Sequence, residues 1–103
     1  MHQILQLLGL AFRAKKVISG EDFCLEGIRN GEIKYLFLAS DAGVNTTKRI
    51  TDKAKFYNIV LDNRFTSIEL SSAIGKNNRM VIGIKDDGFA KKIKEIRWLY
   101  GKR

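Results

Sequence analysis

The spacing of apolar and polar residues predicts that helices and short strands alternate along the whole chain. A stripe of Ile4, Leu7, Leu8 and Ala11 predicts an amphipathic helix over residues 2–15. The pattern then predicts a short strand at 17–18, a helix at 21–30, a stop at Gly31 and a strong strand at 33–39. Residues 15–41 therefore form a strand-helix-strand unit.

Two turns of this unit should lie close together in the folded protein. A crossover helix returns the chain to the end of the sheet that it left, so Gly20 and the Ser40–Asp41 loop should share one edge. Ligand sites in open α/β sheets gather at such edges. We therefore expect the functional residues to centre on the segment from Lys15 to Asp41.

The middle of the chain continues the alternation. Asn45 is a suitable N-cap for a helix over residues 46–57. The buried stripe of that helix would consist of Ile50, Ala54 and Tyr57. Residues 59–61 are all apolar and predict a short buried strand.

The last third of the chain completes the pattern. Thr66 and Glu69 have the spacing of a capping box, which predicts a short helix ending at Gly75. A strand at 80–85 and a last helix capped by Asp86 or Asp87 follow; the helix has lysines on one side and, on the other, Phe89, Ile93, Ile96 and Leu99 or Tyr100. The complete order predicts an α/β fold in one domain over residues 1–103, a three-layer α/β/α sandwich with a mostly parallel or mixed four-stranded sheet.

Charge indicates the kind of partner. The 103 residues carry a net charge of +8, which is large for so small a domain and favours a polyanionic partner. The cations are spread over several elements, whereas residues 21–34 are net acidic. Two alternative roles for the cations stay open, because a cation-rich surface can serve solubility and because Arg13, Lys15 and Lys16 at a helix end also suit its dipole.

The residue inventory argues against an enzyme. His2 beside the N-terminus is the only histidine, and Cys24, within a helix, is the only cysteine and is expected to be a small buried hydrophobe. They leave no catalytic triad, disulfide or usual metal site, and no glycine-rich phosphate loop occurs, so we expect no cofactor. The chain shows no long apolar run and no signal peptide, and we expect a cytoplasmic protein that does not use its basic last helix on a membrane.

A family resemblance covers nearly the whole chain and is carried by LGLAFRAKKVISGEDFCLEGIRNGEIKYLFLASDA, by the spacing to TDKAKFYNI, and by ELSSAIGKNNRMVIGIKDDGFAKKI. The resemblance is to the ribosomal protein family L-seven-Ae, in particular to its small bacterial YlxQ-type members. It implies an α/β/α sandwich that binds RNA kink-turns through the start of the second helix, the loop after the second strand and the loop before the last strand. By position, these segments supply Gly20, Glu21, Asp22, Phe23 and Glu26, then Ser40 and Asp41, then Arg79, Met80 and Val81.

The implied partner is structured RNA, ribosomal RNA or the ribosome, with Arg13, Lys15, Lys16 and Lys76 as further phosphate-binding candidates. The chain departs from the family at the helix start, where kink-turn binders typically have Gly-Thr-Asn-Glu-x-x-Lys. Here Asp22, Phe23 and Glu26 stand at the asparagine, glutamate and lysine positions. An anion in place of a cation beside RNA weakens attraction, so we expect weak binding to an ordinary kink-turn.

A second hypothesis belongs to a different class of function. The same fold could serve as a protein-interaction adaptor or homodimer with weakened RNA recognition, in line with the acidic second helix. Salt separates the two hypotheses, because RNA binding releases counterions whereas an apolar protein interface hardly responds. We expect a monomer, since the sheet already uses the apolar stripe of each helix.

The last helix generates the first testable prediction. Lys91, Lys92 and Lys94 should contribute to RNA affinity without selecting sequence, because flexible ammonium groups mostly meet phosphates. Replacing all three by glutamine should flatten the dependence of log affinity on log salt by up to about three units. An unchanged slope in a filter-binding titration would show that this helix faces away from the RNA.

Overall fold

The computed structural model describes residues 2–101, and Lys102 and Arg103 of the basic tail lie outside the described residues. Its elements follow the predicted order: α1 His2–Arg13, β1 Val17–Ser19, α2 Glu21–Arg29, β2 Tyr35–Leu38, α3 Val44–Phe56, β3 Leu61–Asp62, α4 Ser67–Ala73, β4 Val81–Ile84 and α5 Asp87–Gly101. The capping box of Thr66 and Glu69 is present at the start of α4. Asp86 caps α5, where its carboxylate accepts the backbone N–H of Phe89 at 2.9 Å.

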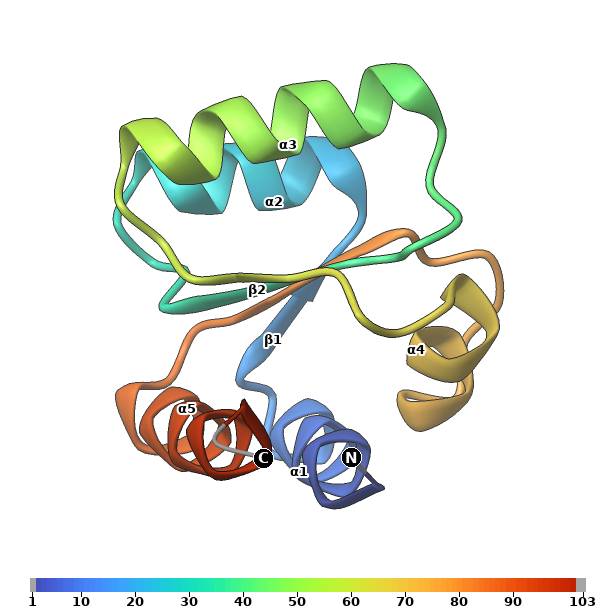
Figure 1. Ribbon diagram of the computed structural model, residues 1–103, viewed down its shortest axis with the longest axis vertical. Helices are drawn as coiled ribbons and strands as arrows, with labels where there is room; N and C mark the ends of the chain where they lie inside the picture. Colours follow the sequence, from blue (N-terminus) through green and yellow to red (C-terminus); the bar gives the residue numbers. More distant parts are fainter. Residues whose placement is uncertain (1, 102–103) are drawn as a thin grey trace.

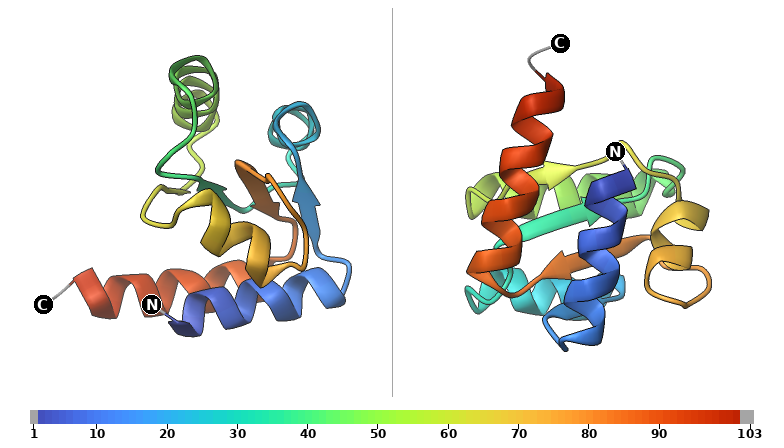
Figure 2. Two further views of the ribbon diagram at one scale, coloured as in Figure 1. Left: turned by 90° about the vertical axis from the view of Figure 1, so that its right-hand side faces the viewer. Right: turned by 90° about the horizontal axis from the view of Figure 1, so that it is seen from below.

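The four strands form one mixed sheet in the order β1-β4-β2-β3. β4 runs antiparallel to both of its neighbours, and β3 pairs parallel with β2. Figures 1 and 2 show α2 and α3 on one face of the sheet, and α1, α4 and α5 on the other. The predicted three-layer α/β/α sandwich with a four-stranded mixed sheet is therefore confirmed.

The central strand β2 contributes to a core on each face of the sheet. Tyr35 and Phe37 pack with α1, α4 and α5, whereas Leu36 and Leu38 pack with α2 and α3. All four side chains are buried, as a sheet covered on both faces requires. Cys24 is fully buried in the α2 layer, as expected, and burial raises the pKa of its thiol to about 12.

The start and the end of α3 differ from the prediction. Gly43 is the N-cap in place of Asn45, because the carbonyl of Gly43 already accepts the N–H of Thr47 at 2.9 Å. The helix ends at Phe56, and Asn58 turns the chain with a φ of 57°. Tyr57 therefore leaves the buried stripe; it is 37% exposed and packs edge-on against Phe56.

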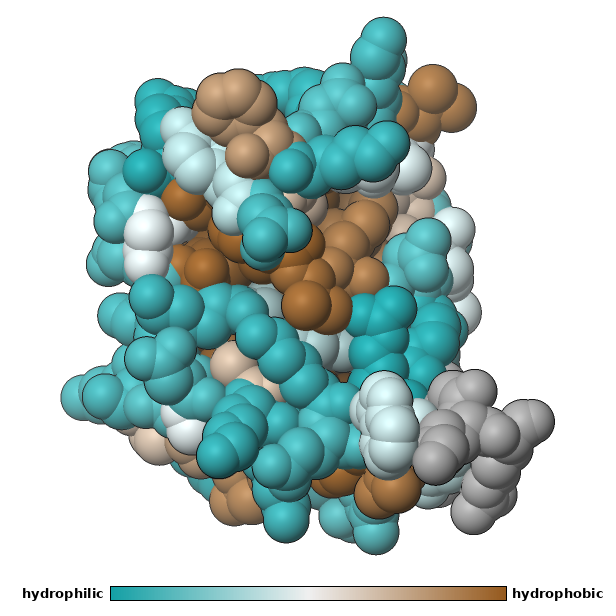
Figure 3. Space-filling model, turned by 60° about the vertical axis from the view of Figure 1, so that its left-hand side comes forward, coloured by the Kyte–Doolittle hydropathy of each residue, from teal (hydrophilic) through white to brown (hydrophobic). Residues whose placement is uncertain are grey.

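The strand predicted at 59–61 is also displaced along the chain. Only Leu61 and Asp62 pair as β3, opposite Leu36 and Phe37 of β2, although the carbonyl of Val60 still accepts the N–H of Leu36. The second strand is likewise shorter than the predicted 33–39. Beside this edge, Ile59, Val60 and Leu61 are only partly buried, and Figure 3 shows an apolar hollow on this side of the molecule.

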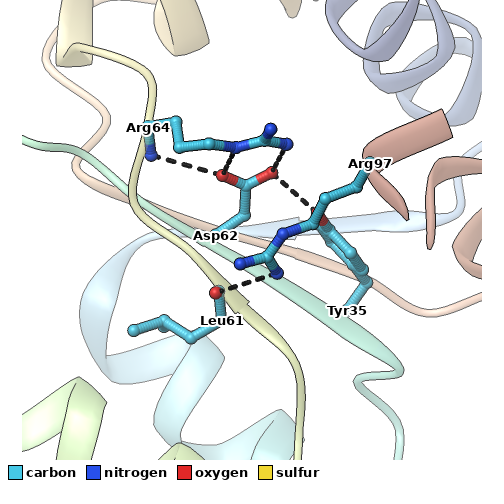
Figure 4. Close-up of polar contacts among 5 residues, drawn as sticks. All are labelled: Tyr35, Leu61, Asp62, Arg64 and Arg97. Carbon is cyan, nitrogen blue, oxygen red and sulfur yellow. Dashed lines mark hydrogen bonds and ion pairs between the residues drawn. The ribbon is translucent and has the colours of Figure 1, made fainter. Parts of the chain in front are cut away.

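A fully buried carboxylate, which the sequence analysis did not single out, fixes the end of β3. Asp62 accepts a hydrogen bond from the Tyr35 hydroxyl at 2.7 Å and two from the side chain of Arg64 at 2.9 Å (Figure 4). The backbone N–H of Arg64 also donates to Asp62, at 3.2 Å. On the neighbouring helix, Arg97 donates to the carbonyl of Leu61 at 3.2 Å, which ties α5 to the same edge strand.

These contacts decide the charge state of Asp62. Burial alone would raise its pKa, but the hydrogen bonds from Arg64 and Tyr35 outweigh burial and lower the pKa below its usual value. Burial, together with this anionic acceptor, raises the pKa of the Tyr35 hydroxyl, so the proton stays on the tyrosine. The group is an ion pair with a tyrosine donor, and it orders the chain between β3 and α4.

Replacing Arg64 should show how strongly the buried Asp62 carboxylate destabilises the protein when it lacks its cation. Arg64→Leu leaves the Asp62 carboxylate without its cation, and the free energy of unfolding should fall by about 3 kcal/mol at pH 7. Urea unfolding measures this loss. Arg29→Leu, at an exposed arginine near the end of α2, is the control and should change stability by no more than about 0.5 kcal/mol.

The loss of unfolding free energy caused by Arg64→Leu should be smaller at acidic pH. In the wild type the pKa of Asp62 is lowered. Asp62 therefore contributes fully to the free energy of unfolding above about pH 4, its pKa in the unfolded chain, and this contribution is lost as the pH falls below that value. In the variant burial raises the pKa of Asp62, and protonation removes the buried charge. The difference in unfolding free energy between the two proteins should therefore narrow from pH 7 to about pH 4, and a constant difference would contradict a charge effect.

Candidate nucleic-acid interface

The three predicted segments meet at the edge of the sheet where β1 and β2 end and β4 begins, which we call the Gly20 edge. The N–H of Gly20 donates to the carbonyl of Val81 at 2.9 Å, and the N–H of Ala39 donates to the carbonyl of Met80 at 2.8 Å. β1 and β2 thus end beside the start of β4, and the left view of Figure 2 looks onto this edge. The expected convergence of Gly20 with the loop after β2 is confirmed.

Gly20 has a backbone conformation that other residues rarely adopt. Its φ is 108°, and it is the N-cap of α2, where its carbonyl accepts the N–H of Cys24. A side chain here would be strained by the backbone angle, whereas space is sufficient. Within residues 2–101 no side chain caps α2, so its first N–H groups point their partial positive charge out of the edge.

The acidic residues of the first turn of α2 are tied to α3. The carboxylate of Glu21 accepts hydrogen bonds from Thr46 at 2.6 Å and from Arg49 at 2.5 Å. Arg49 also lies 3.8 Å from the carboxylate of Asp22, whose side chain is 91% exposed. The sequence showed no cation at helical spacing from Asp22; α3 supplies one across the layer.

Farther along the same helix, Glu26 and Phe23 are both exposed. Glu26 lies one turn after Asp22, so the two carboxylates share a face of α2 as predicted. Phe23 is 69% exposed at the position where the family has an acid. The edge therefore presents carboxylates and an aromatic ring, with backbone N–H groups beside them.

Two further apolar side chains reach solvent in the first turns of neighbouring helices. Val44 begins α3 and is 85% exposed, and Ile68 in α4 is 76% exposed. α3 follows β2, and α4 follows β3, which runs parallel to β2, so both helices begin at the same end of the strands as α2, although α4 lies on the other face of the sheet. Helical periodicity marked neither residue, because Val44 precedes the buried stripe of α3 and Ile68 lies off the buried stripe of α4, which includes Ser67 and Leu70.

The loop after β2 is fastened to α4. The carboxylate of Asp41 accepts the N–H of Ser67 at 2.8 Å and its hydroxyl at 2.7 Å, and these bonds lower the pKa of Asp41. Ser40 is exposed, and its N–H donates to the carbonyl of Phe65 at 2.8 Å. Both Ser40 and Asp41 are exposed, and Asp41 orders the loop through its bonds to Ser67.

The segment before β4 contributes mainly backbone. Val81 is fully buried, and Met80 is partly buried between both core layers. The N–H of Arg79 donates to the hydroxyl of Ser71 at 2.8 Å. Its guanidinium Nε is buried, and no hydrogen-bond acceptor for it occurs among the described residues.

The basic candidates do not all lie at this edge. Lys15 and Lys16 precede β1, and the carbonyl of Lys16 accepts the N–H of Lys85 after β4, so both belong to the opposite end of the strands. Arg13 lines an open depression between α1 and α4. The Lys76 ammonium lies 5.8 Å from the ring of Phe12 on the same flank.

Other classes of site find no support in the described part of the chain. Residues 2–101 contain no group of three or more histidine, cysteine, aspartate or glutamate side chains that could hold a metal ion. None of the described helices is long and apolar enough to span a membrane.

Comparison with known sequences shows two strong similarities. The chain is 45% identical over 92 residues to the RNA-binding protein YlxQ of Enterococcus faecium, which spans 89% of this chain and 88% of that protein. It is 44% identical over 87 residues to the RNA-binding protein YlxQ of Bacillus subtilis (strain 168), which spans 84% and 87%. No family model matches the chain.

Solved structures agree with this result. A protein of unknown function from Bacillus halodurans C superposes with a TM-score of 0.86 and 40% identity, over 90% of this chain and 94% of that one. The Giardia lamblia 15.5kD RNA binding protein superposes with a TM-score of 0.80 over 89% and 79%. At 16% identity, the second similarity establishes the fold alone.

Proposed function

The chain belongs to the YlxQ-type RNA-binding proteins of the ribosomal protein family L-seven-Ae, and on this premise we propose that it is a non-catalytic RNA-binding protein. The whole chain acts as one binding domain, and its ligand is a structured, kink-turn-like RNA such as ribosomal RNA. The observation that carries the proposal is the convergence of Gly20, Ser40 and Met80 at one exposed edge, where their segments are hydrogen-bonded together.

The roles of the edge residues follow from their chemistry. Gly20 lets a nucleic-acid backbone approach the uncapped N–H groups of α2, which attract phosphate oxygens. Phe23 offers a flat face on which an unpaired base can stack. Asp22 and Glu26 can only accept hydrogen bonds, so they select base edges that carry N–H groups and repel phosphates.

Charge elsewhere on the surface supplies the attraction. All of the lysines and arginines lie outside the first turn of α2, among them Lys48 and Arg49 on α3 and Lys76 and Arg79 before β4. Long-range attraction concentrates RNA near the protein, while the acidic turn decides which local shapes can approach closely. This division favours recognition of a particular RNA fold over uniform binding of duplex.

A protein-interaction adaptor is the second candidate function. The observation that favours it is the set of exposed apolar side chains in three first turns, Phe23, Val44 and Ile68. Arg49 also partly neutralises the acids at the start of α2. Titration of a labelled kink-turn RNA and of a duplex of equal length, each at several salt concentrations, separates the two functions. RNA binding requires a steep fall of affinity with salt, and the absence of RNA binding at low salt would leave the adaptor.

The acid at the lysine position gives a sharper prediction. Glu26→Lys should strengthen binding to an ordinary kink-turn by about 1–3 kcal/mol, because a carboxylate that repels RNA phosphates is replaced by an ammonium group that attracts them. Affinities of both proteins for the same RNA at fixed salt measure the gain. Tight wild-type binding with no gain from the lysine would show that the acidic face is no obstacle.

A matched control separates local from general charge effects. Glu32→Lys makes the same change of charge at an exposed position after α2, at the opposite end of that helix from Gly20. It should raise affinity by only a few tenths of a kcal/mol through long-range attraction. Equal gains from Glu32→Lys and Glu26→Lys would contradict a specific role for the first turn of α2.

A further inference from the structure

The end of α5 carries two large apolar side chains that are mostly exposed to solvent. Trp98 is 61% exposed and Leu99 is 60% exposed, whereas Ile93 is fully buried in the core. Arg97 reaches the carbonyl of Leu61 in the edge strand β3, so the sheet ends beneath this residue. Figure 2 shows the last turns of α5 continuing beyond the sheet.

These side chains share the solvent side of the helix with cations. Lys91, Lys94, Glu95, Trp98 and Leu99 line a shallow, open depression of about 580 Å³. The spacing of Lys91, Lys94 and Trp98 places them along one face of α5. Lys92 is exposed on the adjoining turn, and Glu95 is the acid in the lining.

The charge of this surface indicates what can occupy it. An apolar protein partner would have to remove both ammonium groups of the lining from water, at a cost that apolar contact must offset. An unpaired nucleotide has a flat base for an indole ring and a phosphate for each neighbouring ammonium group. Trp98 and the lysines match both parts of such a ligand.

We propose that the surface formed by Lys91, Lys94, Trp98 and Leu99 binds single-stranded RNA, with an unpaired base stacked on Trp98 and the adjacent phosphates at Lys91 and Lys94. This site is separate from the Gly20 edge. It lies on the other face of the sheet, and α5 begins after β4, at the end of the strands opposite Gly20. A structured RNA with a single-stranded extension could occupy both sites at once.

Trp98 itself provides the measurement, because it is the only tryptophan in the chain. The full chain is titrated with a ten-nucleotide oligouridylate at low salt, and tryptophan emission is followed. We expect saturable quenching that weakens steeply with salt. Lys91→Gln with Lys94→Gln should raise the apparent dissociation constant about tenfold or more at low salt, while the indole remains in place.

A second readout covers variants that lack the indole. Anisotropy of a fluorescein-labelled oligouridylate should show that Trp98→Ala weakens binding about tenfold and that Trp98→Phe retains most of it, because a ring for stacking remains. Phe56→Ala is the matched control, since Phe56 is an 81% exposed aromatic residue beside Lys53 and Lys55 on α3. It should leave the affinity unchanged. Thermal unfolding of each variant checks that the fold is intact.

Three outcomes would overturn the proposal. The first is no quenching at low salt, and the second is quenching that the lysine substitutions leave unchanged. The third is a shift of Trp98 emission without RNA that depends on protein concentration, together with a sedimentation mass of a dimer, which would make the surface a protein interface. Absence of kink-turn RNA binding at low salt would count against the Gly20 edge and leave this test unaffected.

Discussion

The hydrogen bonds around Asp62 determine how the loops at the proposed binding edge are held. A buried carboxylate is costly unless it is neutralised, and here one arginine side chain and one tyrosine hydroxyl satisfy it together. The arginine belongs to the loop between β3 and α4, so that loop must follow a fixed path. In the same loop the carbonyl of Phe65 accepts the N–H of Ser40. At the start of α4, the N–H of Ser67 donates to the Asp41 carboxylate. One buried charge thus couples the edge strand to the loop after β2.

The proposed interface combines opposite electrostatic effects on different length scales. Far from the molecule, the net charge of +8 attracts any polyanion. At contact distance, the exposed carboxylates of Asp22 and Glu26 oppose a phosphate, and Arg49 offsets only the first of them among the described residues. Close approach to these two carboxylates therefore needs hydrogen-bond donors from the ligand. Such an arrangement distinguishes partners by local shape and base edges more than by total charge.

The sequence was sufficient for the order of the elements and for the features that follow from that order. It predicted the order of helices and strands, the mixed four-stranded sandwich, the capping box at Thr66 and the shared edge of Gly20 and Ser40. It was wrong about the N-cap of α3, about Tyr57 and about the bounds of β3, where the position of a turn depends on pairing with β2. Arg49 beside Asp22 and Arg64 beside Asp62 could not be recognised as partners of a site or core, because their importance arises from burial and from contacts between layers. Whether the candidate edge residues contact RNA stays a prediction.

The burial of Cys24 gives the protein an internal indicator of its own motions. A thiol whose pKa is raised to about 12 is almost entirely protonated at neutral pH, and the side chain of Cys24, on α2, is fully buried. It reacts with an alkylating or oxidising reagent only when α2 separates from the sheet. Because it is the single cysteine, the rate of that reaction reports how often this layer opens. The opening of α2 can therefore be followed through its natural cysteine, without introducing another reactive residue. A bound ligand that holds the first turn of α2 in place would slow the reaction.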